Sequence, residues 1–247
     1  MLKGLGTVST LLKDLLYISY LVPSSRLRAL VPSALPLRTV GGESFISLVV
    51  MRNTSVGPVW LPWPRQHYNQ MNIRTYVDDP ITGKHGVFFF KSGITSLSAL
   101  VVPRMLGLPW EKIDLQIRTE ADSFGAYRYR ADGDFHGHIT IEVGHLVQQQ
   151  GMGSSASTRD AAMHITTPDM GFVETNARQR LLSFRVEHQF IEPVSCELLD
   201  LQFPLVERLG IIERGEMDKP HSVFLVPEVK FLVHLPPRRV GQAGETR

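Results

Sequence analysis

The stretch "NQMNIRTYVDD", Asn69–Asp79, predicts a β-strand with two unlike faces. The residues on one face suit a pleated, half-buried surface: Met71, Ile73, Thr75 and Val77. Because side chains alternate across a strand, Asn72, Arg74 and Tyr76 share the other face. Two interpretations stay open: this polar face points to water, or it lines a cavity in which an arginine and a phenol meet a ligand.

A second strand, "GVFFFKS" (Gly86–Ser92), follows a segment that carries Pro and Gly turn signals, so the two strands predict a hairpin. In that hairpin the polar face of the first strand meets Phe89 and Lys91 of the second. If the face is interior, Arg74 and Lys91 are buried cations, which are costly unless they are paired or meet an anionic ligand. If it is exterior, both are ordinary surface charges.

The rest of the chain is also rich in strands, and frequent Gly and Pro residues separate them. Residues 95–107 predict a helix with Gly107 after its end. Residues 131–134, "ADGD", predict a tight turn, and residues 148–160 predict a flexible loop. Further strands are expected over residues 43–53, 112–120, 125–132, 136–144, 180–190 and 226–237. The sum is one mostly-β (α+β) domain over residues 1–240, a barrel or a sandwich, with a flexible tail over residues 241–247.

The composition bounds the class of protein. With 247 residues, 43% hydrophobic and 20% charged, the chain is long and apolar enough for a sizeable core. A net charge of +2 does not indicate the strongly basic surface that is typical of nucleic-acid-binding proteins. Cys196 is the only cysteine, so no intrachain disulfide forms. Lys13 and Asp14 interrupt the apolar N-terminal stretch, and no run reaches the roughly 18 apolar residues of a spanning helix, so we expect a soluble, cytoplasmic protein.

Familiar catalytic signatures, among them GxSxG, HExxH and CxxC, are missing from the sequence. His136 and His138 in "HGH" have a spacing that can bind a metal, but the sequence announces no third ligand. Exposed histidines next to a turn are the simpler interpretation, so we expect no metal and no cofactor. In "YRYR", residues 127–130, we expect the tyrosines to face inward and the arginines outward.

Several phrases in order resemble the YqjF-like family of uncharacterised proteins, which is grouped with the acetoacetate decarboxylase-like superfamily. They are "LRALVPSALPLRTVGGESFISLVV", "NIRTYV", "GVFFFKS", "PRMLGLPWEKI" and "HSVFLVPEVKFLVHLPPRRV". The resemblance covers nearly the whole chain and is clearest over residues 27–112. It implies a closed or cone-shaped, mostly antiparallel β-barrel with a few short helices packed outside and a central cavity.

The chain departs from the chemistry that this resemblance implies. Decarboxylases of the superfamily place a Schiff-base lysine and a second lysine directly after a Gly-hydrophobic-Pro phrase, and here those positions hold Trp110 and Glu111. Lys112 is displaced by two residues from the first of them. Leu21 stands where the decarboxylases carry an early arginine, and Gln70 stands where the family has a glutamate. Decarboxylation by the Schiff-base route is therefore not expected.

Three functions remain open. The first is a binding or sensing protein for a small organic molecule with a carboxylate or carbonyl group, which Arg74 would hold with its fork of donors. The second is a lyase, aldolase or cyclase on a keto-acid or polyketide-like substrate, with Tyr76, Glu111 or Glu120 as proton carrier. The third is an interaction scaffold with a filled barrel. The candidate ligand-binding residues are Asn72, Arg74, Tyr76, Lys91, Arg104 and Trp110.

Overall fold

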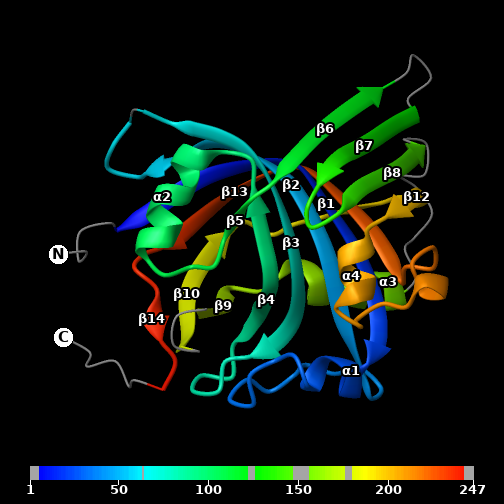
Figure 1. The fold of residues 1–247 in the computed structure, drawn as a ribbon, viewed down its shortest axis with the longest axis horizontal. Helices are drawn as coiled ribbons and strands as arrows, with labels where there is room; N and C mark the ends of the chain where they lie inside the picture. Colours follow the sequence, from blue (N-terminus) through cyan, green and yellow to red (C-terminus); the bar gives the residue numbers. More distant parts are fainter. Residues whose placement is uncertain (1–5, 63, 122–125, 147–155, 176–179, 242–247) are drawn as a thin grey trace.

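The computed structural model describes residues 6–62, 64–121, 126–146, 156–175 and 180–241, and most of them lie in strands, as the sequence predicts (Figure 1). The strands are β1 (Thr7–Pro23), β2 (Glu43–Pro58), β3 (Gln66–Asp78), β4 (His85–Ile94), β5 (Glu111–Lys112), β6 (Asp114–Ala121), β7 (Ala126–Asp134), β8 (His138–Leu146), β9 (Met170–Thr175), β10 (Arg180–His188), β11 (Val194–Ser195), β12 (Glu197–Gln202), β13 (Ser222–His234) and β14 (Arg238–Arg239). The helices are α1 (Ser24–Arg28), α2 (Leu97–Met105), α3 (Ala156–Thr166), α4 (Pro204–Arg208) and the 3-10 turn η2 (Arg214–Glu216).

Seven strands pair in a closed circle, which we call the strand ring. Its order is β13, β1, β2, β3, β4, β9 and β10, and β10 pairs with β13 again. The closing contact is short and antiparallel, and it includes the pair Val186 and Val233. All pairs in the ring are antiparallel except β4 with β9. This circle agrees with the closed or cone-shaped form that the family resemblance implies.

A bulge in β1 controls which of its side chains face the inside of the ring. Asp14 has a φ of 50°, in the left-handed region, and the register against β2 shifts between Lys13 and Leu16. Thr10 and Leu12 line the interior before the bulge, and Tyr17 lines it after the bulge. The inward set therefore changes from even to odd residue numbers at Asp14.

A second sheet, in the order β12, β8, β7 and β6, packs on the outer face of the ring strands β1 to β3 (Figure 1). Leu16, Leu48 and Ile73 from the ring meet Ile117 and Ile141 from the second sheet, and all five are buried. The molecule therefore combines a ring with a sandwich-like contact on one side, and its largest apolar core lies between the two sheets.

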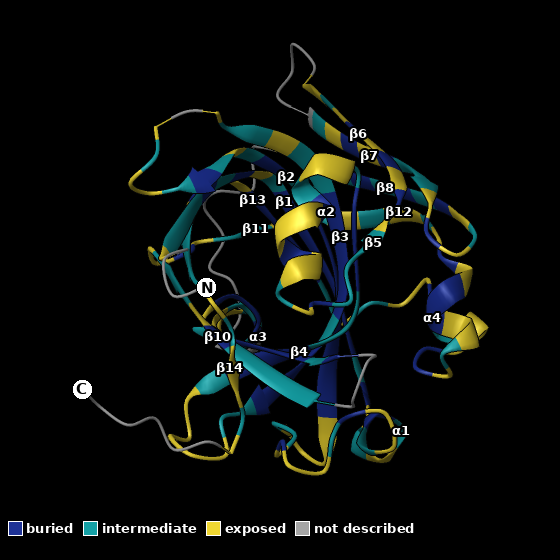
Figure 2. Cartoon of the chain, turned by 60° about the vertical axis from the view of Figure 1, so that its left-hand side comes forward, coloured by how far each residue is buried: buried dark blue, intermediate teal, exposed yellow. Residues whose placement is uncertain are grey.

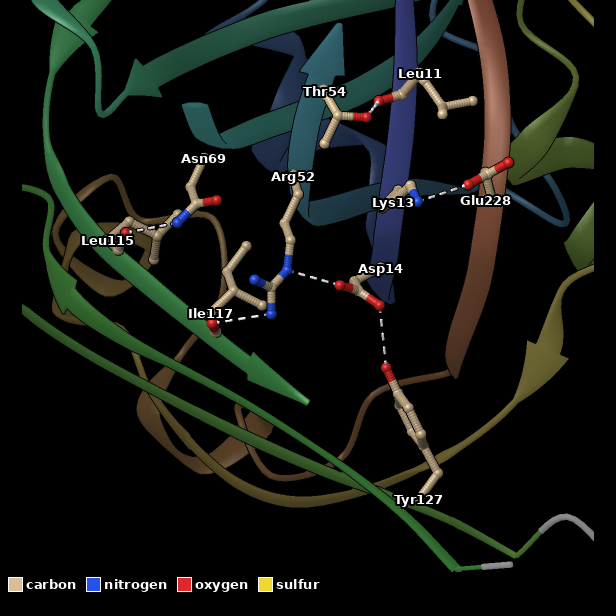
Figure 3. A network of polar contacts seen from close by, with 10 residues as sticks. All are labelled: Leu11, Lys13, Asp14, Arg52, Thr54, Asn69, Leu115, Ile117, Tyr127 and Glu228. Carbon is tan, nitrogen blue, oxygen red and sulfur yellow. Dashed lines mark hydrogen bonds and ion pairs between the residues drawn. The ribbon is translucent and has the colours of Figure 1, made fainter. Parts of the chain in front are cut away.

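A polar clamp joins the two sheets at the bulge (Figure 3). The Arg52 guanidinium on β2 lies 2.6 Å from the Asp14 carboxylate and donates to the Ile117 carbonyl oxygen at 2.9 Å. The Tyr127 hydroxyl on β7 donates to Asp14 Oδ1 at 3.2 Å. Asp14 thus contacts one cation from its own sheet and one phenol from the other.

Two helices cover the ring. Helix α2 begins at a capping contact in which Ser96 Oγ accepts from the Ala99 amide, and Gly107 follows it with a φ of 77°. Most of its residues are exposed (Figure 2), and Ser98, Ala99, Val102 and Pro103, with Leu106 just after the helix, border the cavity. Ala161 and Ile165 of α3 pack against the inward apolar side chains of β1 and β2.

The structure corrects two local predictions. Residues 131–134 lie in β7, and the turn comes later, at Phe135–Gly137, where His136 and Gly137 have positive φ. Gly133 serves close packing instead of a turn, because a Cβ there would lie 2.1 Å from the Asp114 carbonyl oxygen. The predicted loop over residues 148–160 ends in helix α3 from Ala156 onward, and its part before Ala156 lies outside the described residues. Of the predicted tail over residues 241–247, only Gly241 is described.

Candidate ligand cavity

A cavity of about 270 Å³ lies inside the strand ring. Its wall is mostly apolar, with Val87, Phe89 and Phe184 among the lining residues. Most polar side chains come from the three consecutive strands β1, β2 and β3, and one comes from α2: Thr10, Tyr17, Asn53, Gln66, Tyr68, Gln70, Asn72, Arg74 and Ser98. A concave, largely apolar site with a few convergent polar groups is typical of small-molecule binding.

Arg74 is the cationic group of this cavity. Its guanidinium lies over the Tyr17 ring at 5.2 Å and over the Tyr76 ring at 5.5 Å, and it donates to the Ile165 carbonyl oxygen of α3 at 3.0 Å. Its Nε is buried and has no hydrogen-bond partner. Among the ion pairs of the described residues, none includes Arg74. The guanidinium thus contacts two tyrosine rings and the Ile165 carbonyl oxygen in place of a carboxylate.

The alternation along β3 places the other polar residues of the opening stretch. Asn72 is buried and lines the cavity beside Arg74, while Met71 and Ile73 point into the core between the sheets. Tyr76 is fully buried next to Arg74 but is not among the residues that line the cavity. Its hydroxyl is 2.7 Å from Ser47 Oγ, so the phenol supports the arginine from behind.

Lys91 lies on the other face of its strand, contrary to the expectation that it meets Arg74. The register between β3 and β4 shifts by one residue, so that Ile73 pairs with Lys91 while Arg74 pairs with Phe89. A one-residue shift reverses the side-chain direction. Lys91 Nζ instead forms an ion pair with Glu111 at 2.8 Å, and His136 Nε2 contacts the other oxygen of Glu111.

These groups belong to a second hollow of about 390 Å³, lined by Lys91, Trp110 and Glu111 among others. Trp110 lines both this hollow and the interior cavity, and its Nε1 is buried without a hydrogen-bond partner. Arg104, on α2, is exposed and lines neither. The candidate residues predicted from the sequence are thus divided: Asn72, Arg74 and Trp110 line the cavity, Tyr76 backs it, and Lys91 and Arg104 lie outside it.

Sequence reasoning missed seven polar residues of the wall: Thr10, Tyr17, Asn53, Gln66, Tyr68, Gln70 and Ser98. Burial raises the pKa of Tyr17 to about 12, although the nearby Arg74 cation opposes this shift. Tyr17 is therefore a protonated phenol at neutral pH, able to donate a hydrogen bond. Tyr17 faces inward opposite Val49 on β2. The sequence could have indicated this position only if the N-terminal segment had been recognised as a strand.

Two neutral histidines lie behind Tyr76. The ring centroids of His85 and His164 are 5.1 Å apart, and His164 is 5.0 Å from Tyr76. Burial, together with the charge of Arg38, lowers the pKa of His85 to about 3 and that of His164 to about 4. Within the described ranges no three His, Cys, Asp or Glu side chains are grouped as they would be to hold a metal ion. His136 and His138 are both exposed, as the simpler interpretation of "HGH" predicts.

Tyr129 is fully buried and Tyr127 contacts the clamp, whereas Arg128 and Arg130 are exposed and pair with Glu142. The inward tyrosines and outward arginines predicted from "YRYR" are confirmed. In the part of the chain that the structure describes, no helix has both the length and the apolar character needed to cross a membrane.

Comparisons with known proteins agree with this architecture. A family model, DUF2071, described as an uncharacterized conserved protein, matches residues 10–230. The "Uncharacterized protein YqjF" of Bacillus subtilis is 32% identical over 113 residues, which is 44% of this chain and 46% of that protein, so the match spans about half of the relative.

Solved structures of the acetoacetate decarboxylase-like kind share the fold at low sequence identity. An acetoacetate decarboxylase-like enzyme from Sphingomonas wittichii matches with a TM-score of 0.60 at 14% identity, over 96% of this chain and 93% of that one. The enduracididine biosynthesis enzyme MppR, complexed with pyruvate, matches at 0.61 and 12%, over 98% and 92%. Acetoacetate decarboxylase from Legionella pneumophila matches at 0.61 and 13%, over 96% and 88%. At such identities the likeness shows the fold alone.

Proposed function

Because the chain belongs to the DUF2071 family, whose description names no activity, we propose its function from the cavity: it binds a small organic molecule with a carboxylate or carbonyl group inside the strand ring. One observation carries the proposal. Arg74 lines the cavity as a cation that no described carboxylate neutralises. Arg74 is half-buried, and a cation partly removed from water without a counter-charge is costly. An anionic ligand would remove that cost.

The surroundings of Arg74 suit an acid of modest size. Tyr17 lines the same wall as a protonated phenol, and Asn72 adds an amide. Arginine presents planar, paired donors that match the two oxygens of a carboxylate. MppR, which shares the fold, has been solved with pyruvate, a small acid with a carbonyl group. The rest of the wall would enclose the apolar part of such a molecule.

The enzyme alternative has less support in this cavity. Of its three proposed proton carriers, Glu111 is ion-paired in the outer hollow, Glu120 is exposed on β6, and Tyr76 is hydrogen-bonded to Ser47 behind the wall. No carboxylate or histidine is among the described residues that line the cavity. A general base within reach of a bound substrate is the first requirement of such chemistry. Binding without turnover therefore fits the described wall better.

The test is a thermal-shift screen of small carboxylic and oxo acids on the wild type, Arg74→Leu and Arg104→Leu. Arg104 is the matched control, because it is an exposed arginine outside the cavity. A ligand that binds only the folded state raises the melting temperature by mass action. We expect at least one acid to stabilise the wild type and Arg104→Leu but not Arg74→Leu. Shifts of equal size in all three proteins would contradict the proposed role of Arg74.

A further inference from the structure

Four buried side chains of the cavity wall hydrogen-bond in a row, which we call the amide relay. Thr10 Oγ1 donates to Asn53 Oδ1 at 3.2 Å, Asn53 Nδ2 donates to Gln70 Oε1 at 3.0 Å, and Gln70 Nε2 donates to Asn72 Oδ1 at 3.0 Å. The row crosses from β1 over β2 to β3, and all four residues line the cavity. The row ends at Asn72, which lies two residues before Arg74 on the same face of β3.

The relay has a direction. Each amide accepts on the side of Thr10 and donates on the side of Asn72, so the oxygen of every amide in the row is already occupied. Among the hydrogen bonds of the described residues, none uses Nδ2 of Asn72. Because successive hydrogen bonds in a chain polarise one another, the hydroxyl at one end helps to fix the orientation of the amide at the other. Asn72 is thereby held with its donor end free, beside the donors of Arg74.

A wall that offers donors in two adjacent places selects acceptors. A carboxylate can occupy Arg74, and a second oxygen on the same molecule can accept from Asn72 Nδ2. An acid without that oxygen leaves a buried donor unpaired, which is costly. An amino acid would bring an ammonium group to a place that already holds a guanidinium and an amide donor.

The facing wall, formed by β4, β10 and β13, is apolar. Phe89 of β4 and Phe184 of β10 stack with their ring centroids 6.0 Å apart, and both line the cavity. Val186, Phe231 and Val233 continue this wall toward the seam at which the ring closes. The body of the ligand that meets these side chains is therefore hydrocarbon.

We propose that the amide relay is a specificity device: it presents Asn72 as a donor beside Arg74, so that the cavity selects apolar acids carrying an oxygen acceptor next to the carboxylate. This inference rests on the proposed function, and it makes Thr10 a positioning residue that acts on the ligand through Asn53, Gln70 and Asn72. In this role the residues of the relay influence which acid the cavity prefers, although none of them needs to contact the carboxylate.

The experiment compares three acids that share the leucine carbon skeleton: the oxo acid, the plain acid without the oxo group, and the amino acid itself. Affinities are measured by titration calorimetry on the wild type, Thr10→Val, Thr10→Ser and Arg74→Leu. The wild type is expected to bind the oxo acid roughly tenfold more tightly than the plain acid, the difference expected for one unpaired buried donor. The amino acid is expected to bind more weakly than either.

The variants separate a positioning role from a structural one. Thr10→Val keeps the shape of the side chain but removes the hydroxyl, so the ratio of the two affinities should fall toward one while the plain acid still binds. Thr10→Ser restores the donor and should restore the ratio. The melting temperature of each variant shows that it is folded.

The outcomes also separate this inference from the proposed function. Equal binding of the oxo and plain acids by the wild type, with both lost in Arg74→Leu, overturns the relay inference and supports the arginine as the acid anchor. A preference that persists undiminished in Thr10→Val overturns the positioning role of the relay. If the wild type binds none of the three acids, the inference is overturned, whereas the proposed function is decided by the wider acid screen.

Discussion

Arg74 and Tyr17 lie together in the cavity wall, and no lysine of the described residues lines it. Lys91 is ion-paired with Glu111 in the outer hollow, and the exposed Lys112 donates from Nζ to the Ile113 carbonyl oxygen at 2.7 Å. None of the residues that line the cavity is a lysine. Schiff-base chemistry needs a lysine nitrogen, free of protons and within reach of the carbonyl carbon.

We therefore expect no covalent adduct with acetoacetate. Incubation with acetoacetate followed by borohydride reduction should leave the mass of the protein unchanged in a mass spectrum. A stable mass increase that maps to Lys91 or Lys112 would contradict this prediction and would favour an enzymatic function.

At the residue level the sequence predicts the wall only in part. The strict alternation in β3 was sufficient to place Asn72 and Arg74 on one face. Lys91 could not be placed in the same way, because the register shift between β3 and β4 arises from pairing and leaves no mark in the residue types. The amide relay joins side chains from three strands, and only their pairing brings those residues together.

Among the elements, β1 shows most clearly where sequence reasoning stops. Its segment "TLLKDLL" does not alternate with period two, because the bulge at Asp14 changes the inward set of side chains. The hairpin of β3 and β4, with its turn residues between two regular runs, was predictable and is confirmed. The strand that supplies Thr10 and Tyr17 to the cavity was not identified from the sequence.

The clamp at this bulge makes a prediction about stability. Asp14→Asn keeps a residue that tolerates positive φ but removes the charge that Arg52 and Tyr127 contact. Since the carboxylate is only partly exposed, we expect the free energy of unfolding to fall by about 1 kcal/mol. Urea unfolding of the two proteins measures the difference.

Lys13→Ala is the matched control for this change. Lys13 is the neighbouring residue, and its ion pair with Glu228 at 3.0 Å is about half exposed on both sides. Surface pairs of this kind contribute little, so the free energy of unfolding should change by less than about 0.5 kcal/mol. If Asp14→Asn and Lys13→Ala lower the free energy of unfolding equally, the clamp stabilises the contact between the sheets no more than an exposed ion pair would.

For the molecule as a whole, the half-buried His85 and His164 predict how the free energy of unfolding depends on pH. The folded pKa values of His85 and His164, about 3 and about 4, lie below the ordinary value of 6.5. The unfolded chain therefore takes up protons first as the pH falls. His164 makes the folded state less stable from about pH 6.5 down to about pH 4, and His85 does so down to about pH 3. Each contributes a slope of at most about 1.4 kcal/mol per pH unit.

Unfolding in urea at pH 7.5 and at pH 5 measures this dependence. The double variant His85→Leu/His164→Leu should lose less stability between the two pH values than the wild type does. His138→Gln, at an exposed position on β8, is the control and should lose as much as the wild type. An unchanged pH dependence in the double variant would contradict the assignment of neutral histidines behind Tyr76.

The pairing of β1 with β13 has a consequence for synthesis of the chain. β1 lies between β2 and β13 in the ring, and the contact of Thr7 with His234 joins residues 227 positions apart. At roughly 5–20 residues per second, one edge of β1 waits on the order of ten seconds or more for its partner to leave the ribosome. During that interval a long strand with buried-type residues such as Leu12 and Leu15 presents an open edge, which invites aggregation or chaperone binding. A strand near the end of the chain, β13, thus ends the exposure of the first strand, β1.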